Sequence, residues 1–277
     1  MCRLFYAYNV PYMKKKIQDF LQQSDHEAKH TPGLNSPSDY ITHMDGFGLA
    51  WFNIMTHRWK SLKSPKLYKQ VQSLDTKIND IRVSNLVVGH IRRQSGDAAP
   101  AMENTHPFTY RNQLFIHNGY LDGFHRKRET MLRDMHYEYR NHVVGDTDTE
   151  CMFYLYLTFK RQRENRALQP HLANDQSPDT ICVLAMTDLF AYLRTHFSRF
   201  NANIIYANKS YSIISRYSFS REGGLVAPSL YINGELERGK LLITSEPIME
   251  TWTLIPNHTL FVVKHTEGEY YAVNLHT

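Results

Sequence analysis

The sequence predicts an α+β protein made of packed β-sheets and helices that are segregated from the strands. Strand-like segments occupy both ends of the chain, and helix-like segments are grouped in its middle. Neighbouring strands are joined by short hairpin connections at both ends. This order favours packed sheets over alternating β–α–β units.

The first half of the chain consists mostly of short strands rich in apolar and aromatic residues. One helix is expected over 10–24, with Pro11 in its first turn. Residues 24–45 read as a polar loop that crosses the surface, because they are dense in turn-forming residues. The other expected elements are strands at 4–8, 46–54, 57–63, 84–93 and 113–121, a helical segment over 67–81 and an irregular loop at 94–108.

The second half begins with helices and returns to strands. Asn208-Lys209 and Gly234 mark hairpin turns between strands. The expected helices are at about 125–140, 148–165 and 178–197, and the expected strands are at 202–208, 210–218, 239–247, 258–265 and 269–276.

Length and composition indicate a globular protein. The chain has 277 residues, of which 42% are hydrophobic and 21% are charged, and a chain of this length can bury a full core. Length alone allows one large domain or two small ones. Because no linker-like segment divides the chain, we predict a single domain over 1–277.

Charge and cysteine content restrict the class of protein. The formal net charge is +5, and the short basic clusters at 14–16 and 126–128 read as solvated helix faces, so we expect no nucleic-acid partner. An odd count of three cysteines without regular spacing is typical of a reducing compartment. The sequence contains no apolar run typical of a signal peptide or a membrane span, so we expect a cytoplasmic protein with no membrane partner.

One short motif matches a zinc-binding pattern. His26 to His30, with the sequence HEAKH, fits H-E-x-x-H, in which two histidines on one helix face bind zinc. Pro32 would end such a helix almost at once, and no apolar stripe would bury it. We therefore interpret the segment as a polar loop or a helix end and expect no metal site.

We expect the initiator Met1 to be removed, because the residue that follows it is small, and Cys2 then becomes the first residue. Its thiol would then stand beside an α-amine whose reference pKa of about 7.7–8.0 leaves a useful fraction neutral near neutral pH. Nucleophile and general base would lie on one residue. On position alone, a buried cysteine that acts as a small hydrophobic residue is the simpler interpretation. We expect Cys151 and Cys182 to be core residues of that kind.

Three further segments place polar residues at the ends of buried elements. Arg92 ends one β-branched strand, and Asn118-Gly119 ends another. Asp148 lies in the first turn of a helix that begins with a capping-box pattern at 147–150. Each also has a simpler structural interpretation: an ion pair at a strand end, a turn dipeptide, and an acid that complements the helix dipole.

Taken together and in order, these segments resemble the class II glutamine amidotransferases, which are N-terminal-nucleophile hydrolases. The motifs are Cys2 after the initiator, GHIR, THPF, HNG and DTDTE. HMDGFGLAWF and the run TSEPIMETWTLIPNHTLFVV resemble the compact members without a synthase domain, such as the ergothioneine-pathway γ-glutamyl amidohydrolase and the fungal glutathione-degrading subunit. The resemblance covers most of the chain and implies a four-layer αββα sandwich, with two stacked antiparallel sheets between outer helices.

The resemblance also implies a role for each matched residue. Cys2 would attack the γ-carbonyl of a γ-glutamyl amide, and the side-chain amide of Asn118 with the N–H of Gly119 would form the oxyanion hole. Arg92 would hold the glutamyl α-carboxylate, because a guanidinium can bind a carboxylate through two parallel hydrogen bonds. Asp148 would bind the α-ammonium.

The chain departs from the pattern of synthase-linked members directly after Arg92. Those members typically continue Trp-Ala-Thr-His-Gly, whereas this chain continues RQSG. Ser95 could replace the threonine hydroxyl in substrate binding, but the aromatic residue and the histidine are missing. The departure bears on substrate preference more than on hydrolase chemistry. Residues 103–108 (ENTHPF) would line the pocket or support its wall.

The expected activity is cleavage of a γ-glutamyl amide, either glutamine or a larger compound such as glutathione. The reaction would pass through a γ-glutamyl thioester on Cys2 and need no cofactor. One alternative is an amidotransferase subunit that delivers ammonia to, or acts with, a separate synthase or hydrolase polypeptide. Another is a non-catalytic γ-glutamyl-binding protein. Retained Met1 would favour the last, because it blocks the α-amine and leaves Cys2 internal.

Overall fold

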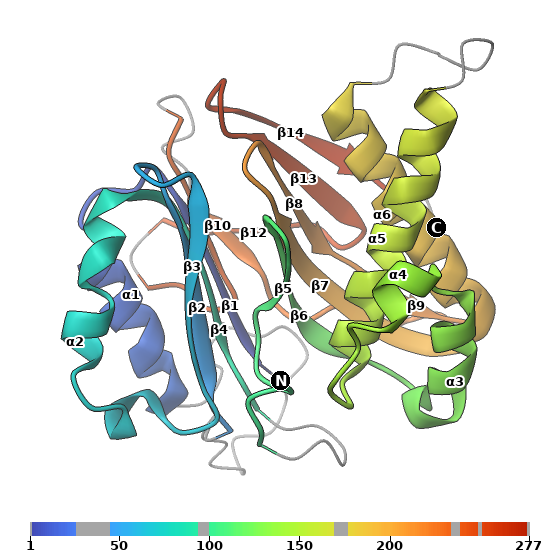
Figure 1. Cartoon of the computed structure of the whole chain (residues 1–277), viewed down its shortest axis with the longest axis horizontal. Coiled ribbons are helices and arrows are strands. Elements are labelled where there is room, and N and C mark those ends of the chain that lie inside the picture. Colours follow the sequence, from blue (N-terminus) through green and yellow to red (C-terminus); the bar gives the residue numbers. More distant parts are fainter. Residues whose placement is uncertain are drawn as a thin grey trace.

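Two seven-stranded sheets stack face to face in the computed structural model, which describes residues 2–25, 45–93, 100–168, 177–233, 239–248 and 251–275 (Figure 1). The pairings between neighbouring strands are antiparallel. The strands of the first sheet, from one edge to the other, are β12 (Thr253–Leu254), β10 (Tyr231–Asn233), β11 (Leu241–Thr244), β1 (Arg3–Tyr8), β4 (Ser84–Ile91), β2 (Phe47–Asn53) and β3 (Arg58–Ser64).

The second sheet is built from the middle and the C-terminal part of the chain. Its strands are β14 (Glu269–Asn274), β13 (Thr259–Lys264), β8 (Tyr211–Arg216), β7 (Arg199–Ala207), β6 (Gln113–Leu121) and β5 (Phe108–Tyr110), with β9 (Ser218–Ser220) paired to β7.

Helices cover the two outer faces of this pair of sheets (Figure 1). The first sheet carries α1 (Met13–Gln22) and the short α2 (Leu74–Lys77), with the 3₁₀ turns η1 (Gln23–Asp25), η2 (Tyr68–Gln70) and η3 (Asn79–Val83). The second sheet carries α3 (Phe124–Asp134), α4 (Tyr137–Arg140), α5 (Asp148–Ala167) and α6 (Pro178–His196). Among the described residues, no helix combines the length and the apolar character needed to cross a membrane.

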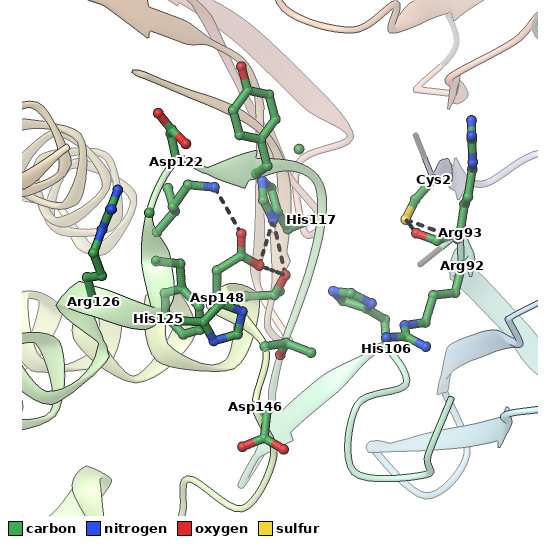
Figure 2. A pocket seen from close by; sticks show the side chains of 17 residues that line it. Cys2, Arg92, Arg93, His106, His117, Asp122, His125, Arg126, Asp146 and Asp148 are labelled. Carbon is green, nitrogen blue, oxygen red and sulfur yellow. Dashed lines mark hydrogen bonds and ion pairs between the residues drawn. The ribbon is translucent and has the colours of Figure 1, made fainter. Parts of the chain in front are cut away.

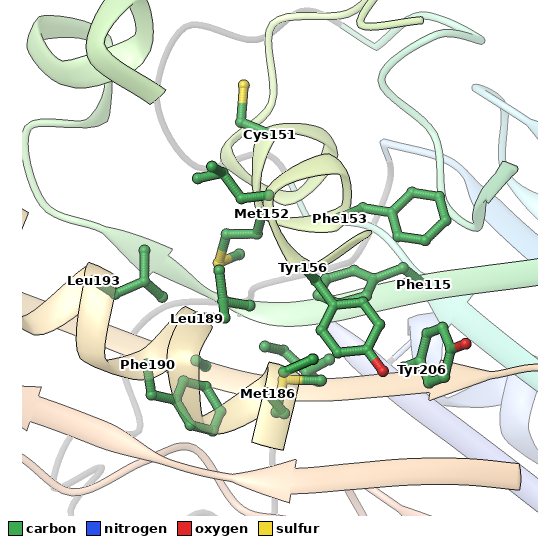
Figure 3. Packing of buried hydrophobic residues seen from close by; sticks show 14 of the residues in the cluster. Phe115, Cys151, Met152, Phe153, Tyr156, Met186, Leu189, Phe190, Leu193 and Tyr206 are labelled. Atoms are coloured by element: carbon green, nitrogen blue, oxygen red, sulfur yellow. The ribbon is translucent and has the colours of Figure 1, made fainter. Parts of the chain in front are cut away.

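Three hydrophobic clusters fill the spaces between the four layers. One joins α1 to the first sheet, one lies between the sheets, and one joins the second sheet to α5 and α6. Figure 3 shows the last of these, where Phe153 and Tyr156 of α5 meet Phe115 of β6 and Leu189 of α6. The predicted αββα arrangement is therefore confirmed. Cys151 and Cys182 are 0% and 2% exposed, which confirms them as core residues.

Side chains alternate between these clusters along each strand, as the two-residue period of a strand requires. On β1, Leu4 and Tyr6 pack between the sheets, whereas Phe5 packs against α1. On β6, Ile116 packs between the sheets and Phe115 packs against the helices. This alternation decides which polar residues at the strand ends face the other sheet.

The prediction of one helical segment over 67–81 was wrong. The structure has a four-residue helix, α2, between the 3₁₀ turns η2 and η3. Ser73, directly before α2, has a left-handed backbone with φ of 56°, which a continuous helix cannot contain. Packing of scattered apolar residues against the sheet, rather than helix propensity, shapes this segment.

The prediction of one helix over 125–140 was also wrong, because the segment is divided at Met135. This residue has an extended backbone, with ψ of 144°, and its side chain is buried in the core. His136 then begins α4, and its side chain accepts a hydrogen bond from the backbone N–H of Glu138. Burial of Met135 and the new cap separate α3 from α4.

Several boundaries differ from the prediction. Pro11 precedes α1 instead of lying in its first turn, because Tyr12 has a left-handed backbone with φ of 55°. The strand expected at 210–218 is divided into β8 and β9, and the short strands β5, β10 and β12 were not predicted. The turn at Asn208 is confirmed, since its Oδ1 accepts hydrogen bonds from the N–H groups of Ser210 and Tyr211. Gly234 lies outside the described residues.

Ile116 lies in the layer between the sheets, and its side chain is fully buried. We therefore expect truncation of this side chain to destabilise the fold strongly. Ile116→Ala should lower the free energy of unfolding by about 2–5 kcal/mol, because it removes buried methyl groups and leaves a cavity. The matched control is Ile54→Ala, at a residue that is 44% exposed. Urea denaturation measures both variants, and equal effects would contradict the assignment of Ile116 to the core.

Candidate active site

A cavity of about 550 Å³ opens at the end of the sandwich where β1 begins and where β4 and β6 end. Cys2, Arg92, Gly119 and Asp148 all line it. In Figure 2, Cys2 and Arg92 approach from the side of the first sheet, and Asp148 approaches from the opposite side. The remaining lining residues are Arg93, His106, His117, Tyr120, Leu121, Asp122, Gly123, Phe124, His125, Arg126, Asp146, Thr147 and Thr149.

Cys2 stands directly before β1, and the strand alternation turns its side chain to the same side as Leu4, between the sheets. The half-buried thiol lies 3.3 Å from the Arg93 amide nitrogen, which donates to it, and 3.4 Å from the Arg93 carbonyl oxygen. Burial raises the pKa of the Cys2 thiol, whereas the Arg93 hydrogen bond and the Arg92 charge lower it. The net shift is upward, so a base is needed to form the thiolate near neutral pH.

The backbone directly after Cys2 is held by Ser245 and Glu246, which are far from it in the sequence. The Leu4 N–H donates to the Ser245 hydroxyl at 2.9 Å, and the Ser245 N–H donates to the Leu4 carbonyl at 3.0 Å. Arg3 forms an ion pair with Glu246, with an N–O distance of 3.6 Å, and both side chains are only 3% exposed. These contacts hold the start of β1 in register.

Arg92 follows β4 and is 4% exposed. Its backbone N–H donates to the Gly46 carbonyl at 2.8 Å, which extends the pairing of β4 with the chain before β2. Strand alternation places the Arg92 side chain on the same side as Val88, between the sheets. A guanidinium at this position gives the cavity wall beside Cys2 a fixed positive charge.

Asp148 is the first residue of α5, as predicted, and its carboxylate faces β6. The Leu121 N–H donates to one carboxylate oxygen at 3.1 Å, and the Thr149 hydroxyl donates to the other at 3.2 Å. Thr147 caps the helix by accepting the Glu150 N–H at 3.2 Å. The cavity therefore has a negative charge held at a helix N-terminus, opposite Arg92.

The capping box is only half formed. Glu150 does not bond back to the Thr147 N–H; its carboxylate accepts instead from the N–H groups of Gly145 at 2.7 Å and Val144 at 3.2 Å. Glu150 thus binds the loop before α5, whereas the capping-box pattern predicts that it binds the Thr147 N–H. Glu150 therefore orders the loop that carries Asp146 and Thr147 into the cavity wall.

His117 connects β6 to α5 at the base of the cavity. Its Nδ1 lies 3.0 Å from the Thr149 hydroxyl, and its Nε2 lies 2.9 Å from the Asn201 carbonyl. Burial lowers the pKa of this imidazole, and the Asp148 carboxylate, 3.9 Å away, acts in the opposite direction. The Nε2–H donates to the Asn201 carbonyl, which holds the His117 ring in place beside Asp148.

The two predicted oxyanion-hole residues occupy different places. Gly119 lines the cavity, and a Cβ atom there would lie 2.0 Å from the Asn201 carbonyl oxygen, so no other residue fits without movement of β7. Asn118 is not among the lining residues; it is 2% exposed and lies opposite Asn203 of β7. Within the described residues, its Oδ1 has no hydrogen-bond partner.

Two sequence predictions fall on parts of the chain that the structure does not describe. Ser95 lies in the gap at 94–99, and the HEAKH segment lies in the gap at 26–44. Within the described ranges, no group of three or more histidine, cysteine or acidic side chains could hold a metal ion.

The sequence-based prediction missed Arg93 and His117 and left the place of His106 open. Arg93 holds the thiol through its backbone, so its side-chain type gives no signal. His117 directly precedes Asn118 in the HNG motif, and its position beside a candidate site residue was the available signal. His106 lies in the predicted ENTHPF segment and lines the cavity.

Comparisons with known proteins show the family of this chain and agree with its fold. Residues 34–193, more than half of the chain, match the family described as glutamine amidotransferases class-II. That range includes Arg92, Asn118, Gly119 and Asp148, whereas Cys2 lies before it. The chain therefore belongs to the class II glutamine amidotransferases.

Two curated proteins that are similar to this chain are also described as glutamine amidotransferases. The chain is 25% identical over 254 residues to the probable glutamine amidotransferase DUG3 of Saccharomyces cerevisiae, a match that covers 79% of this chain and 69% of that protein. It is 31% identical over 116 residues to the putative glutamine amidotransferase YafJ of Escherichia coli, a match that covers 40% of each chain.

Solved structures share the fold. A glutamine aminotransferase class-II domain protein from Silicibacter pomeroyi superposes with a TM-score of 0.62 at 18% identity and covers 100% of both chains. Glutamine phosphoribosylpyrophosphate amidotransferase from B. subtilis superposes with a TM-score of 0.55 at 14% identity, over 99% of this chain and 49% of that one.

The Thr147 hydroxyl caps α5 at the cavity wall and should contribute to the stability of the fold. Thr147→Ala should lower the free energy of unfolding by about 1–2 kcal/mol, because the Glu150 N–H loses its acceptor. Thr147→Ser keeps the hydroxyl and should retain most of the stability. Guanidinium denaturation of the two variants provides the comparison, and a serine variant as unstable as the alanine variant would show that the hydroxyl is not the cause.

Proposed function

We propose that this chain is an amidohydrolase that cleaves the γ-amide bond of glutamine or of a larger γ-glutamyl compound. The observation that carries the proposal is the meeting of Cys2, Arg92, Gly119 and Asp148 at one cavity. These residues come from four separate elements of the chain, and together they supply a nucleophile, a cation, a backbone donor and an anion.

The charges on the two cavity walls match the two charges of a glutamyl group. The Arg92 guanidinium would bind the α-carboxylate through two parallel hydrogen bonds. The Asp148 carboxylate would bind the α-ammonium from the opposite wall. With both ends of the amino acid fixed, the γ-carbonyl would be oriented toward Cys2, and such orientation lowers the entropic barrier to attack.

The chemistry would begin with the α-amine of Cys2, after Met1 has been removed. The neutral amine takes the thiol proton, because the raised pKa of the thiol leaves little thiolate otherwise. The thiolate attacks the γ-carbon, and the Gly119 N–H stabilises the oxyanion. The Asn118 amide, which does not line the cavity, would have to turn toward it to act as a second donor. Collapse breaks the C–N bond, the protonated α-amine gives its proton to the departing ammonia or amine, and a γ-glutamyl thioester remains.

Water would complete the cycle. The α-amine, now neutral again, takes a proton from a water molecule that attacks the thioester. The C–S bond breaks, glutamate leaves, and the proton returns to the Cys2 sulfur. One water molecule is consumed and one amine is released in each turnover, without a change of oxidation state.

Labelling with a glutamine-analogue electrophile tests the nucleophile. Diazo-oxo-norleucine should alkylate Cys2 in protein whose N-terminus is shown by mass spectrometry to lack Met1. Cys151 and Cys182 should remain unmodified, because they are 0% and 2% exposed. Absence of label on the processed Cys2, or label on either buried cysteine, would count against the proposal.

Turnover of a panel of γ-glutamyl amides tests the reaction and its leaving group. The wild-type chain should release glutamate from glutamine, glutathione or another γ-glutamyl compound, and Cys2→Ala should lose roughly 10⁴–10⁶-fold in kcat. Cys182→Ala is the matched control and should keep its activity. A Cys2→Ala variant that still turns over at the wild-type rate would refute the thioester mechanism.

A second candidate is transfer of the released ammonia to an acceptor site on a separate polypeptide. It is favoured by the fold that the chain shares with the B. subtilis glutamine phosphoribosylpyrophosphate amidotransferase. The thioester would be the same, and only the fate of the ammonia differs. Ordinary turnover by the isolated chain, with no co-purifying protein, would decide for hydrolysis.

A further inference from the structure

His106 is a histidine of the cavity wall to which the proposed mechanism assigns no role. Its side chain is 5% exposed and lines the cavity. Figure 2 shows the ring beside the Arg92 guanidinium, on the side of the cavity that also carries Cys2. The ring is therefore next to the group proposed to hold the α-carboxylate.

Two aromatic neighbours hold this ring in position. Its centroid lies 3.8 Å from that of His90 of β4, with the two rings tilted by 34°, and it meets Phe108 edge to face at 4.9 Å. The backbone of His106 also lies close to the first sheet. A Cβ atom on Gly48 of β2 would lie 1.8 Å from the His106 carbonyl oxygen. Gly48 thus allows the segment to cross β2 closely enough to bring the ring to Arg92.

The polar atoms of His106 are not used within the protein. Among the described residues, neither Nδ1 nor Nε2 has a hydrogen-bond partner. Burial holds the pKa of the imidazole well below its usual value, and the nearby Arg92 charge acts in the same direction. The ring is therefore neutral near pH 7, with one N–H donor and one acceptor. An unpaired buried polar group is unfavourable, and a bound ligand that accepts from it would recover that free energy.

The positive charge of Arg92 favours an anionic ligand as the hydrogen-bond acceptor for the His106 N–H. A ligand atom that reaches both the Arg92 guanidinium and the His106 ring lies beside a desolvated cation, where a carboxylate is favoured and an ammonium is repelled. A carboxylate has about four acceptor sites on its two oxygens, so it can accept from a guanidinium and an imidazole together. Asp148, on the opposite wall, is left to meet the ammonium.

Building on the proposed function, we propose that His106 is a substrate-binding residue that donates a hydrogen bond to the α-carboxylate held by Arg92. The selectivity for a free α-carboxylate then depends on two donors. The imidazole is the less costly of the two to desolvate, because it carries no charge.

Ligand binding to the Cys2→Ala variant, which cannot turn over, tests this role. Titration calorimetry should show that adding His106→Phe weakens the binding of L-glutamine by roughly 10- to 100-fold, since a hydrogen bond to a charged group is lost. Binding of the α-carboxamide analogue of L-glutamine should change little. His106→Gln, which keeps an N–H donor, should recover part of the loss. Equal weakening of both ligands would overturn the proposal.

Two further variants separate the hydrogen bond from the fold. His258→Phe is the matched control, because His258 is a half-buried histidine outside the cavity lining, and it should leave binding unchanged. Gly48→Ala keeps the ring but displaces its backbone, so it should reproduce the loss for L-glutamine. Thermal unfolding of each variant checks that it is folded.

The kinetic form of the test uses the wild-type nucleophile. His106→Phe should raise KM for L-glutamine with a smaller effect on kcat, because the contact is made in the ground state and in the transition state. If the Cys2→Ala protein binds L-glutamine through His106 but the wild type does not hydrolyse it, the proposed reaction fails and the binding role stands. If Cys2→Ala binds neither ligand, the role of His106 is refuted.

Discussion

The pairing of β1 between β11 and β4 is the constraint on which the rest of the site depends. The first strand of the chain is a central strand of its sheet, and its partners come from 84–91 and 241–244. A slip of one residue would turn Leu4 and Tyr6 out of the layer between the sheets and would turn Cys2 away from the cavity. The alternation of side chains along β1 and its hydrogen bonds to Ser245 therefore hold the Cys2 thiol in position, as they do the core residues of the strand.

The layer between the sheets changes character along its length. It is apolar where Tyr6, Val88 and Ile116 pack together, and it becomes polar at the cavity end, where Cys2 and Arg92 follow in the same alternation. Buried polar groups of this kind cost stability unless a partner satisfies them. The polar groups of the layer are gathered at this one end, and the Cys2 thiol is held there by the backbone of Arg93.

The sequence supported the order of elements and the polar residues at their ends, because both depend on local signals. Strand periodicity located β1, β4 and β6, and the capping pattern located the start of α5. Tertiary contacts decided the rest. The strands β10 and β12 have three and two residues, and they exist only because the sheet offers them an edge. The position of His106 depends on its contact with Gly48, and no local pattern encodes that contact.

The proposed function requires that a γ-glutamyl group form a thioester with the sulfur of Cys2. The most direct measurement is intact-protein mass spectrometry after acid quench of the processed chain, mixed with a γ-glutamyl substrate, followed by mapping of the adduct. The account predicts one γ-glutamyl group on the N-terminal peptide, in a bond that hydroxylamine cleaves, and none in Cys2→Ala. Substrate turnover by a chain with no such adduct, or an adduct on another residue, would contradict it.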